Sequence, residues 1–207
     1  MVEIVYDSPQ AAVVIKPCGL GSEEKGLVTV LRDQLGCDIF PVHRLDQPVG
    51  GLMIYGKSPQ AAEKLKNDLL AKEYLAIVPD QLTKDEDTLE DLLFHDRTRN
   101  KTFVVSRQRN GVKKAVLHYR VLERKPGVAL LRIALQTGRT HQIRVQFASR
   151  RMPLLGDGKY GSKLNTPIAL WSCHLRFRDP SDGIIREFTR MPPAVPPWNQ
   201  HDFEYLK

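Results

Sequence analysis

The chain has 207 residues, 42% of them hydrophobic and 27% charged, and its 31 Lys and Arg against 24 Asp and Glu give a net charge of +7. This composition supports a buried core in one lobe or two, excludes disordered, collagen-like and coiled-coil classes, and favours a polyanionic partner, although the charge also serves simple solubility. Because no apolar run reaches the roughly 18 residues of a membrane span and the N-terminus lacks a signal-peptide pattern, we expect a cytoplasmic protein that engages no membrane.

The first forty residues predict two strands and a helix. Apolar runs at Glu3–Tyr6 and Ala12–Lys16 predict strands joined by a turn. Helical spacing of apolar residues predicts a helix over Leu27–Leu35, which Gly36 ends because glycine readily adopts a left-handed conformation. We expect Phe40–Asp46 to form a loop.

A buried strand, a helix and a further strand follow. Leu52–Tyr55 predicts a buried strand that is entered through two glycines. Ser58 caps the next helix, and Pro59 fits its first turn, where a missing N–H costs nothing. Tyr74–Val78 predicts the strand after it. The buried stripe of the helix is expected to contain Ala61, Ala62, Leu65, Leu69 and Leu70.

The charge reverses in the middle of the chain. An acidic stretch from Asp80 to Asp91 is followed by Arg97–Arg120, which holds eight basic residues and no carboxylate. This segment predicts two strands joined by a hairpin turn at Asn110-Gly111, a basic arm suited to face RNA.

The rest of the chain predicts two antiparallel pairs around one helix. Val116–Leu122 and Val128–Leu135 form the first pair, and a helix runs from Thr140 to about Arg150. Ile168–Phe177 and Ile184–Thr189 predict a final hairpin. Since strands rarely alternate with helices, the sequence predicts an α+β fold with mostly antiparallel pairing.

Familiar metal and nucleotide motifs are missing. Cys18, Cys37 and Cys173 form no CxxC pair, and the six histidines are scattered, so we expect no metal. The sequence contains no phosphate-binding loop, dinucleotide-binding turn or nucleophile elbow. We therefore expect chemistry carried by side chains without a cofactor.

The first polar cluster is His43-Arg44-Leu45-Asp46, between a helix and a buried strand. A loop held by rigid elements is where sites occur, and Asp46 could act there as a nucleophile or base. Alternatively, Asp46 caps its turn or pairs with Arg44, and His43 is a structural histidine.

The second cluster sits at a predicted helix start, which carries Arg139, His141 and Arg144. Cations are unfavourable at the positive end of a helix dipole, so the cluster suggests a bound phosphate or a catalytic carboxylate. The competing interpretation is that these arginines pair with local acids.

Two tyrosines stand in further motifs. Tyr160 follows Leu155-Gly156-Asp157 in a glycine-containing loop, where its ring could stack on a ligand or fill the core. Tyr74 opens a predicted strand, and its ring could face either a cleft or the core.

Taken together and in order, these segments resemble the RluA-type pseudouridine synthases, which isomerise uridine to pseudouridine in ribosomal or transfer RNA. The motifs that carry the resemblance are Lys16-Pro17 with Gly19, His43-Arg44-Leu45-Asp46 with Gly51-Leu52, Lys72-Glu73-Tyr74-Leu75-Ala76, Thr137-Gly138-Arg139-Thr140-His141-Gln142-Ile143-Arg144, Leu155-Gly156-Asp157 and Tyr160-Gly161.

The resemblance implies a single catalytic domain over residues 1–207, built on a mainly antiparallel mixed sheet with flanking helices. It assigns the catalytic aspartate to Asp46, the active-site tyrosine to Tyr74, the basic partner of the aspartate to Arg144, and extrusion of the base to Arg44. Because the motifs begin almost at the first residue, we expect no S4-like RNA-binding domain before them. Val49-Gly50 replaces the Thr-Ser of many relatives.

The implied substrate is a loop or single-stranded uridine, since a paired base must first be flipped out. The expected substrate-binding residues are Arg44, His43, Arg139, His141, Ile143 and Leu52. We expect a monomer whose RNA affinity comes from its basic surface. The alternatives are a noncatalytic RNA-binding or ribosome-assembly protein with the same fold, and a small-molecule enzyme that holds an anionic substrate with Arg139 and Arg144.

Overall fold

The computed structural model describes residues 1–201 and 203 and divides the chain into two compact units. Unit 1 comprises residues 1–72, 171–193 and 203, and unit 2 comprises residues 73–170 and 194–201. The chain first passes from unit 1 to unit 2 within strand β5 (Leu69–Pro79).

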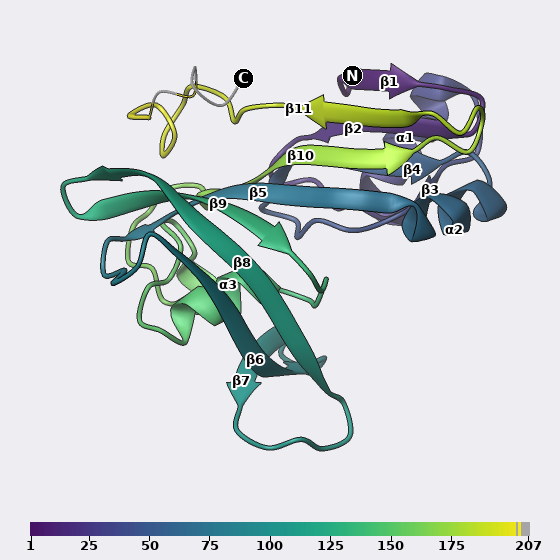
Figure 1. Ribbon diagram of the computed structural model, residues 1–207. Coiled ribbons are helices and arrows are strands. Elements are labelled where there is room, and N and C mark those ends of the chain that lie inside the picture. The colour runs from purple at the N-terminus through teal and green to yellow at the C-terminus, as the bar shows by residue number, and fades with distance from the viewer. Residues whose placement is uncertain (202, 204–207) are drawn as a thin grey trace. The chain divides into compact units, whose positions relative to one another are not determined.

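Unit 1 contains a sheet with the strand order β1-β2-β4-β10-β11, and the short β3 also pairs with β4 (Figure 1). β4 and β10 are parallel, and the other pairs are antiparallel. The final hairpin, β10–β11, is confirmed, whereas the predicted loop over Phe40–Asp46 begins with β3. The strands are β1 (Ile4–Asp7), β2 (Ala11–Lys16), β3 (Phe40–Pro41), β4 (Gly50–Gly56), β10 (Leu170–Arg178) and β11 (Ile185–Thr189).

The helices of unit 1 largely follow their local signals. An irregular turn, η1 (Glu24–Val28), precedes α1 (Thr29–Leu35), which ends at Gly36 in a left-handed conformation as expected. α2 (Pro59–Asn67) begins at Ser58, whose Oγ accepts a hydrogen bond from the Ala61 N–H at 3.1 Å. The prediction was wrong for Leu69 and Leu70, which lie in β5, because the chain leaves the helix after Asn67 and continues as an extended strand.

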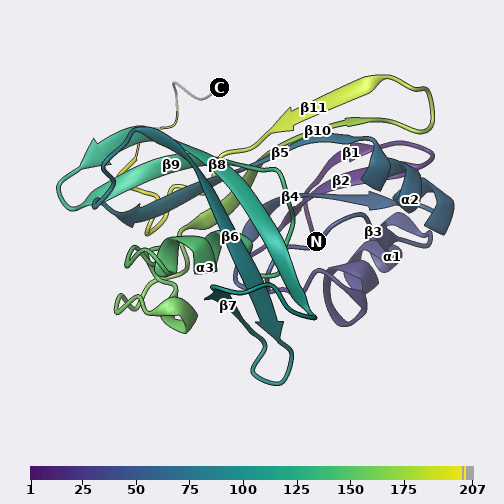
Figure 2. The ribbon, with the colours of Figure 1, turned by 60° about the horizontal axis from the view of Figure 1, so that its bottom comes forward.

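The core of unit 1 lies under α2. Alternate residues of three strands gather on one face of the sheet, and Leu65 of α2 packs against them. α2 contacts β2, β3 and β4 (Figure 2). The buried cluster consists of Ala11, Val13, Val42, Leu52, Ile54, Leu65, Leu175 and Phe177.

Unit 2 contains an antiparallel sheet with the order β5-β9-β8-β6-β7. The predicted hairpin at Asn110-Gly111 is wrong, because β7 and β8 do not pair with each other but flank β6 on either side. The pair predicted around Pro126-Gly127 is confirmed as β8 with β9. The strands are β6 (Glu86–Asp96), β7 (Lys101–Val105), β8 (Val112–Lys125) and β9 (Val128–Leu135).

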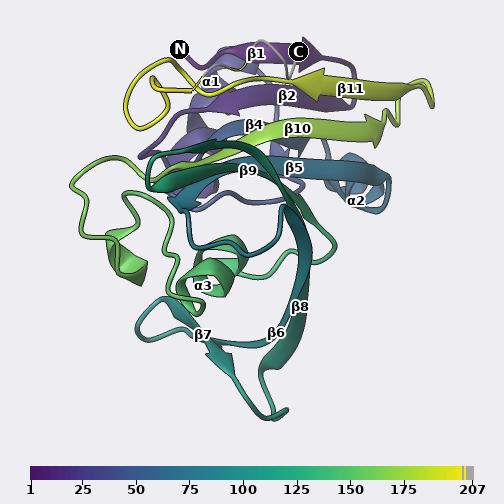
Figure 3. The ribbon, with the colours of Figure 1, turned by 60° about the vertical axis from the view of Figure 1, so that its left-hand side comes forward.

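Helix α3 (Gln142–Ala148) packs on one face of this sheet, inside the curve of β6 and β8 (Figure 3). Val145 contacts Leu93 and Ala115 there. The helix is shorter than predicted, because His141 adopts a left-handed conformation at its N-terminus. A short turn, η2 (Gly158–Tyr160), follows at the same side.

The fold class is confirmed as α+β with a mainly antiparallel mixed sheet. Among residues 1–201 and 203, no helix is long and apolar enough to cross a membrane. The same residues contain no group of three or more His, Cys, Asp and Glu side chains that could hold a metal ion.

Candidate active site

The side chains singled out by the motifs fall into two sets. His43, Arg44, Asp46 and Leu52 belong to unit 1. The unit 2 set consists of Tyr74, Arg139, His141, Ile143 and Arg144.

In unit 1 a buried lysine organises the loop that carries Asp46. Lys16, at the end of β2, has no exposed surface. Its Nζ donates hydrogen bonds to the carbonyl oxygens of Pro17, Gln47 and Val49 at 3.0, 3.1 and 2.6 Å. The ammonium thus joins the residue that follows β2 to the segment that precedes β4, and it fixes the backbone on the C-terminal side of Asp46.

A second group of contacts holds the other side of this loop. Ser22 Oγ donates to the Leu45 carbonyl at 2.7 Å and accepts from the Leu45 N–H at 3.1 Å. Gly51, at the start of β4, has a φ of +116°, and a Cβ there would lie 2.3 Å from the Ser172 carbonyl oxygen. Glycine is required at this position, so the turn after Asp46 is tightly determined.

The electrostatics of this loop centre on Lys16. Burial lowers its pKa from 10.5 to about 8, while Cys18 and the Asp46 carboxylate act in the opposite direction. Asp46 is half-buried. The Asp46 carboxylate is therefore one of the charges that act on the buried Lys16 ammonium.

The other unit 1 residues differ in their surroundings. Arg44 is exposed and pairs with Glu23 at 3.1 Å, which gives it a partner other than the Asp46 of the alternative considered above. Leu52 lies in the core under α2. Both ring nitrogens of His43 are buried, and neither has a hydrogen-bond partner at good geometry in the described part of the chain. Burial, and secondarily the Lys72 ammonium, lower the pKa of His43 well below its usual value, so the ring is neutral.

In unit 2 a buried ion pair holds Arg144. Its Nε and Nη2 donate to Oδ2 and Oδ1 of Asp157, both at 2.8 Å, and the two side chains are 6% and 1% exposed. The pairing with a local acid that we considered is thus confirmed for Arg144. A bidentate, buried pair fixes the plane of the guanidinium.

Tyr160 connects this ion pair to β7. Its ring centroid lies 5.1 Å from the Arg144 guanidinium carbon. Its hydroxyl accepts from the Thr102 N–H at 2.9 Å and lies 2.9 Å from Nδ1 of His141. Thr102 in turn donates through Oγ1 to the Thr140 carbonyl at 2.9 Å. The network ties the start of α3 to the edge strand of the sheet.

The segment before α3 is fastened by Gln142. Its Oε1 accepts from Thr137 Oγ1 at 2.8 Å and from the Arg139 N–H at 3.0 Å, and its Nε2 donates to the Val116 carbonyl at 3.1 Å. Arg139 Nε donates to the Lys114 carbonyl at 3.0 Å. Arg139 is therefore positioned by backbone contact with β8, and it has no ion pair among residues 1–201 and 203.

Tyr74 and Ile143 are both buried in unit 2. Tyr74 pairs with Ile133, which also pairs with Tyr119, and the Tyr119 ring contacts Phe147 of α3 at 5.7 Å between centroids. Directly paired residues share a face, so Tyr74 belongs to the α3 side of the sheet.

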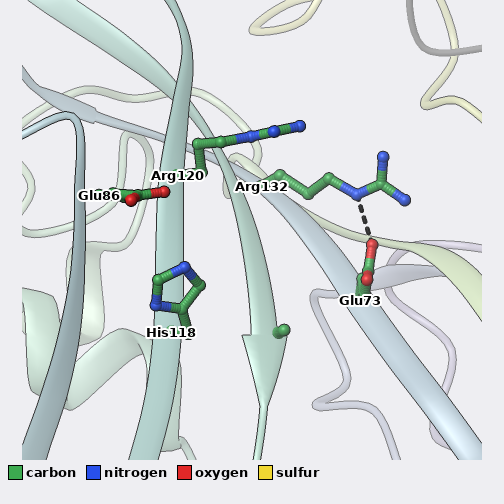
Figure 4. A pocket seen from close by; sticks show the side chains of 6 residues that line it. Glu73, Glu86, His118, Arg120 and Arg132 are labelled. Atoms are coloured by element: carbon green, nitrogen blue, oxygen red, sulfur yellow. Dashed lines mark hydrogen bonds and ion pairs between the residues drawn. The ribbon is translucent and has the colours of Figure 1, made fainter.

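The opposite face of the same sheet carries a hollow of about 280 Å³ (Figure 4). Its lining contains none of the residues singled out for the site; it consists of Glu73, Glu86, His118, Arg120, Arg132 and Ala134. Glu73 and Arg132 form an ion pair at one side of the hollow. Because neighbouring residues in a strand alternate in direction, Glu73 points away from the face of Tyr74.

The sequence does not reveal the supporting roles of Lys16 and Asp157, although both lie in the motifs quoted above. For Tyr160 it leaves open whether the ring stacks on a ligand or fills the core. The signal for Lys16 is a charged residue at the end of an apolar strand, and the signal for Asp157 is an acid in a loop rich in glycine. Either pattern predicts a buried charge with a specific partner.

The comparison with protein families matches residues 10–149 to the RNA pseudouridylate synthase family. An uncharacterised RNA pseudouridine synthase, YlyB of Bacillus subtilis, is 33% identical over 207 aligned residues, which cover 90% of this chain and 67% of that protein. Ribosomal large subunit pseudouridine synthase D of Pseudomonas aeruginosa is 36% identical, over 80% of this chain and 55% of that protein. The chain thus spans between about half and two thirds of the length of these relatives.

The fold agrees with that comparison. The structure of human RNA pseudouridylate synthase domain containing 1 superimposes with a TM-score of 0.77 over 95% of this chain and 85% of the human chain, at 22% identity. The motif-based resemblance is thereby confirmed, and the chain belongs to the RNA pseudouridylate synthase family of the RluA type.

Proposed function

We propose that this chain isomerises loop or single-stranded uridines of ribosomal or transfer RNA to pseudouridine, with residues 1–207 acting as one catalytic domain. The reaction breaks the bond between ribose and N1 of uracil, turns the base, and joins the sugar to C5, with no net redox change. As part of this proposal we expect a monomer that acts in the cytoplasm, where these RNAs are found.

The observation that carries the proposal is the fixed loop of Asp46. A loop that carries an ordinary surface carboxylate needs no buried hydrogen bonds to fix it. Here three carbonyls around the loop accept hydrogen bonds from one buried ammonium, and Ser22 binds the residue before Asp46. A fixed carboxylate suits an attack on ribose or uracil, or the removal of a proton.

In this proposal Asp46 is the nucleophile or base, and Arg144 keeps it ionised. Tyr74 stacks on the flipped uracil and assists removal of the C5 proton. Arg44, which is exposed, extrudes the base. The contacts to RNA come from His43, Arg139 and His141, while Ile143 and the core residue Leu52 keep the surroundings apolar and exclude water that would hydrolyse the detached sugar.

The basic segment Arg97–Arg120 supplies the RNA affinity. It covers β7, both of its connections and the first part of β8. Since cations that bind phosphates release counterions, we expect the affinity for RNA to fall steeply with salt. An affinity that stays flat as salt rises severalfold contradicts this part of the proposal.

The test is release of tritium from RNA made with uridine labelled at C5, because the C5–H bond is lost when the sugar joins C5. We expect release with the wild-type chain and a loss of about a thousandfold or more with Asp46→Asn. Asp38→Asn serves as the matched control, since Asp38 is 75% exposed in the same unit and should leave the rate unchanged.

The cellular form of the test identifies the RNA. Pseudouridines are mapped in a strain that lacks the gene, with wild-type or Asp46→Asn copies added back. Sites that return only with the wild type support the proposal. Full tritium release by Asp46→Asn, or no release by the wild type on total RNA, favours the noncatalytic RNA-binding alternative.

A further inference from the structure

Two aromatic side chains lie in register on the face of unit 2 that is turned away from α3. Phe94 of β6 pairs with Phe103 of β7, and both are half-buried. Their neighbours Leu93 and Val104 point to the α3 side and form its core. By strand alternation the two phenylalanines therefore point to the opposite face.

Each ring is accompanied by a cation. The Arg109 guanidinium lies 5.0 Å from the centroid of Phe94. Lys101, on the edge strand β7, has its Nζ 5.9 Å from the centroid of Phe103 and 5.3 Å from that of Tyr160, so its ammonium lies between the two rings. Arg109 comes from the connection between β7 and β8, at the free end of these strands in Figure 1. We name Phe94, Phe103, Lys101 and Arg109 the aromatic–basic surface.

Neither cation is neutralised by a carboxylate. In the part of the chain that the structure describes, neither Lys101 nor Arg109 has an acidic group within 4.0 Å. Unit 1 offers a contrast, because Arg186 lies over the Tyr6 ring at 5.6 Å but is paired with Asp182 at 2.6 Å and also donates to the Tyr6 hydroxyl. The charge of Arg186 is therefore balanced within the chain, whereas the charges of Lys101 and Arg109 on the aromatic–basic surface are not balanced by a nearby carboxylate.

The backbone keeps Phe94 accessible. Gly111 has a φ of +80°, and even a Cβ there would lie 3.5 Å from the ring, at ordinary contact distance. A larger side chain at this position would cover the edge of Phe94. A left-handed glycine turns the chain without doing so.

We propose that the aromatic–basic surface binds unpaired nucleotides of the RNA, outside the catalytic site, by stacking bases on Phe94 and Phe103 while Lys101 and Arg109 move from the ring faces to the flanking phosphates. This inference rests on the proposed function, because it takes RNA as the substrate. Rows of aromatic rings next to cations are how proteins bind single strands without reading their sequence. Duplex RNA offers phosphates but no free base faces, so it should gain little from this surface.

The first test measures affinity by fluorescence anisotropy of a labelled oligouridylate of about 20 nucleotides and of a duplex of the same length. Phe94→Leu/Phe103→Leu keeps apolar side chains but removes the rings, and we expect it to weaken single-strand binding about fivefold to a hundredfold. Duplex affinity should stay within about twofold of wild type.

A matched control is Phe188→Leu, which removes a half-buried ring that packs on Phe177 in unit 1. It should leave both affinities unchanged. Arg109→Gln should lower the slope of log affinity against log salt by about 0.7, whereas the double phenylalanine variant should leave that slope unchanged. Equal weakening of single strand and duplex by the double variant, or wild-type affinity for both, overturns the proposal.

A second measurement uses the unchanged chain. Irradiation with a bromouridine-containing oligonucleotide, followed by peptide mapping, should give adducts at Phe94 or Phe103, and adducts confined to other residues overturn the proposal. Neither readout needs catalysis. Adducts at these rings without tritium release leave the surface standing and defeat the proposed function, while tritium release with unaltered affinity of the double variant defeats the surface alone.

Discussion

In unit 1 the loop of Asp46 is held by one buried ammonium bound to backbone carbonyls, whereas in unit 2 Arg144 is held by the carboxylate of Asp157 and the ring of Tyr160. The first arrangement fixes main chain, and within the described residues the hydrogen bonds of Lys16 go to backbone carbonyls and to no carboxylate. The second fixes a side chain through a charged partner, the Asp157 carboxylate.

The difference predicts different sensitivities. Removal of Lys16 takes one charge away and leaves neutral carbonyls without a donor. Removal of Asp157 takes a bidentate carboxylate away from a buried guanidinium, and loss of such a partner costs more than an unsatisfied carbonyl. The unit 2 arrangement should therefore be the more fragile of the two.

The largest effect is expected for Asp157→Asn. It removes the charge of the carboxylate that binds the buried Arg144 guanidinium through two hydrogen bonds and should lower the free energy of unfolding by about 3–5 kcal/mol, measured by urea denaturation of the full chain. Asp91→Asn is the matched control, because the Arg150–Asp91 pair at 2.8 Å is more exposed, with 31% and 12% of its side chains accessible. It should cost about 1 kcal/mol, and equal costs for the two variants contradict the special role of burial.

Lys16→Met comes next. It keeps an unbranched apolar side chain of nearly the same length but removes the donor from three carbonyls, and should cost about 2–3 kcal/mol. Lys57→Met breaks an ion pair with Asp7 at 2.6 Å in the same unit and should cost about 1 kcal/mol or less. Tritium release should fall with Lys16→Met and stay at wild-type level with Lys57→Met. Unaffected release in Lys16→Met would mean that its contacts do not position Asp46.

The features that the sequence predicted are those set by neighbours in the chain. Ser58 caps α2, Gly36 ends α1, and Pro126-Gly127 turns β8 into β9, since each depends on a few adjacent residues. Asp46, Arg144 and Tyr74 were singled out because whole motifs resembled a family, since single residues would not have sufficed.

The features that the sequence does not predict depend on residues that are far away along the chain. Asn110-Gly111 predicts a turn, but the residues around it do not indicate that β7 and β8 both pair with β6 and not with each other. Leu69 and Leu70 continue the apolar spacing of α2 in the sequence. They nevertheless belong to β5, because strand pairing in the folded protein overrides the local pattern. The Arg144–Asp157 pair joins residues of two different motifs, which no spacing within either motif reveals.

Tyr160→Phe separates the ring from the hydroxyl in the unit 2 network. The ring under Arg144 stays, but the buried Thr102 N–H loses its acceptor, so we expect a cost of about 1–2 kcal/mol and tritium release within a few-fold of wild type. Tyr119→Phe is the control, because that hydroxyl donates only a 3.5 Å hydrogen bond to the Lys84 carbonyl. A loss of release as deep as that of Asp46→Asn would assign the hydroxyl a chemical role.

The smallest expected effect is a dependence of stability on pH that belongs to Lys16 alone. Since burial lowers its pKa from 10.5 to about 8, the unfolded chain binds more protons than the folded chain between these values. Stability must then rise with pH there, by about 1 kcal/mol from pH 8 to pH 9.

Activity should move the other way, because the neutral amine has two N–H donors for three carbonyls. The measurement compares urea midpoints of the wild type and Lys16→Met at pH 7, 8 and 9. Burial also lowers the pKa of Lys72 to about 8, but Lys72 contributes equally to both chains, so their difference isolates Lys16. If this difference does not change with pH, the pKa of Lys16 is ordinary. The Asp46 loop is then held by its backbone contacts alone, and burial of the Lys16 charge does not contribute.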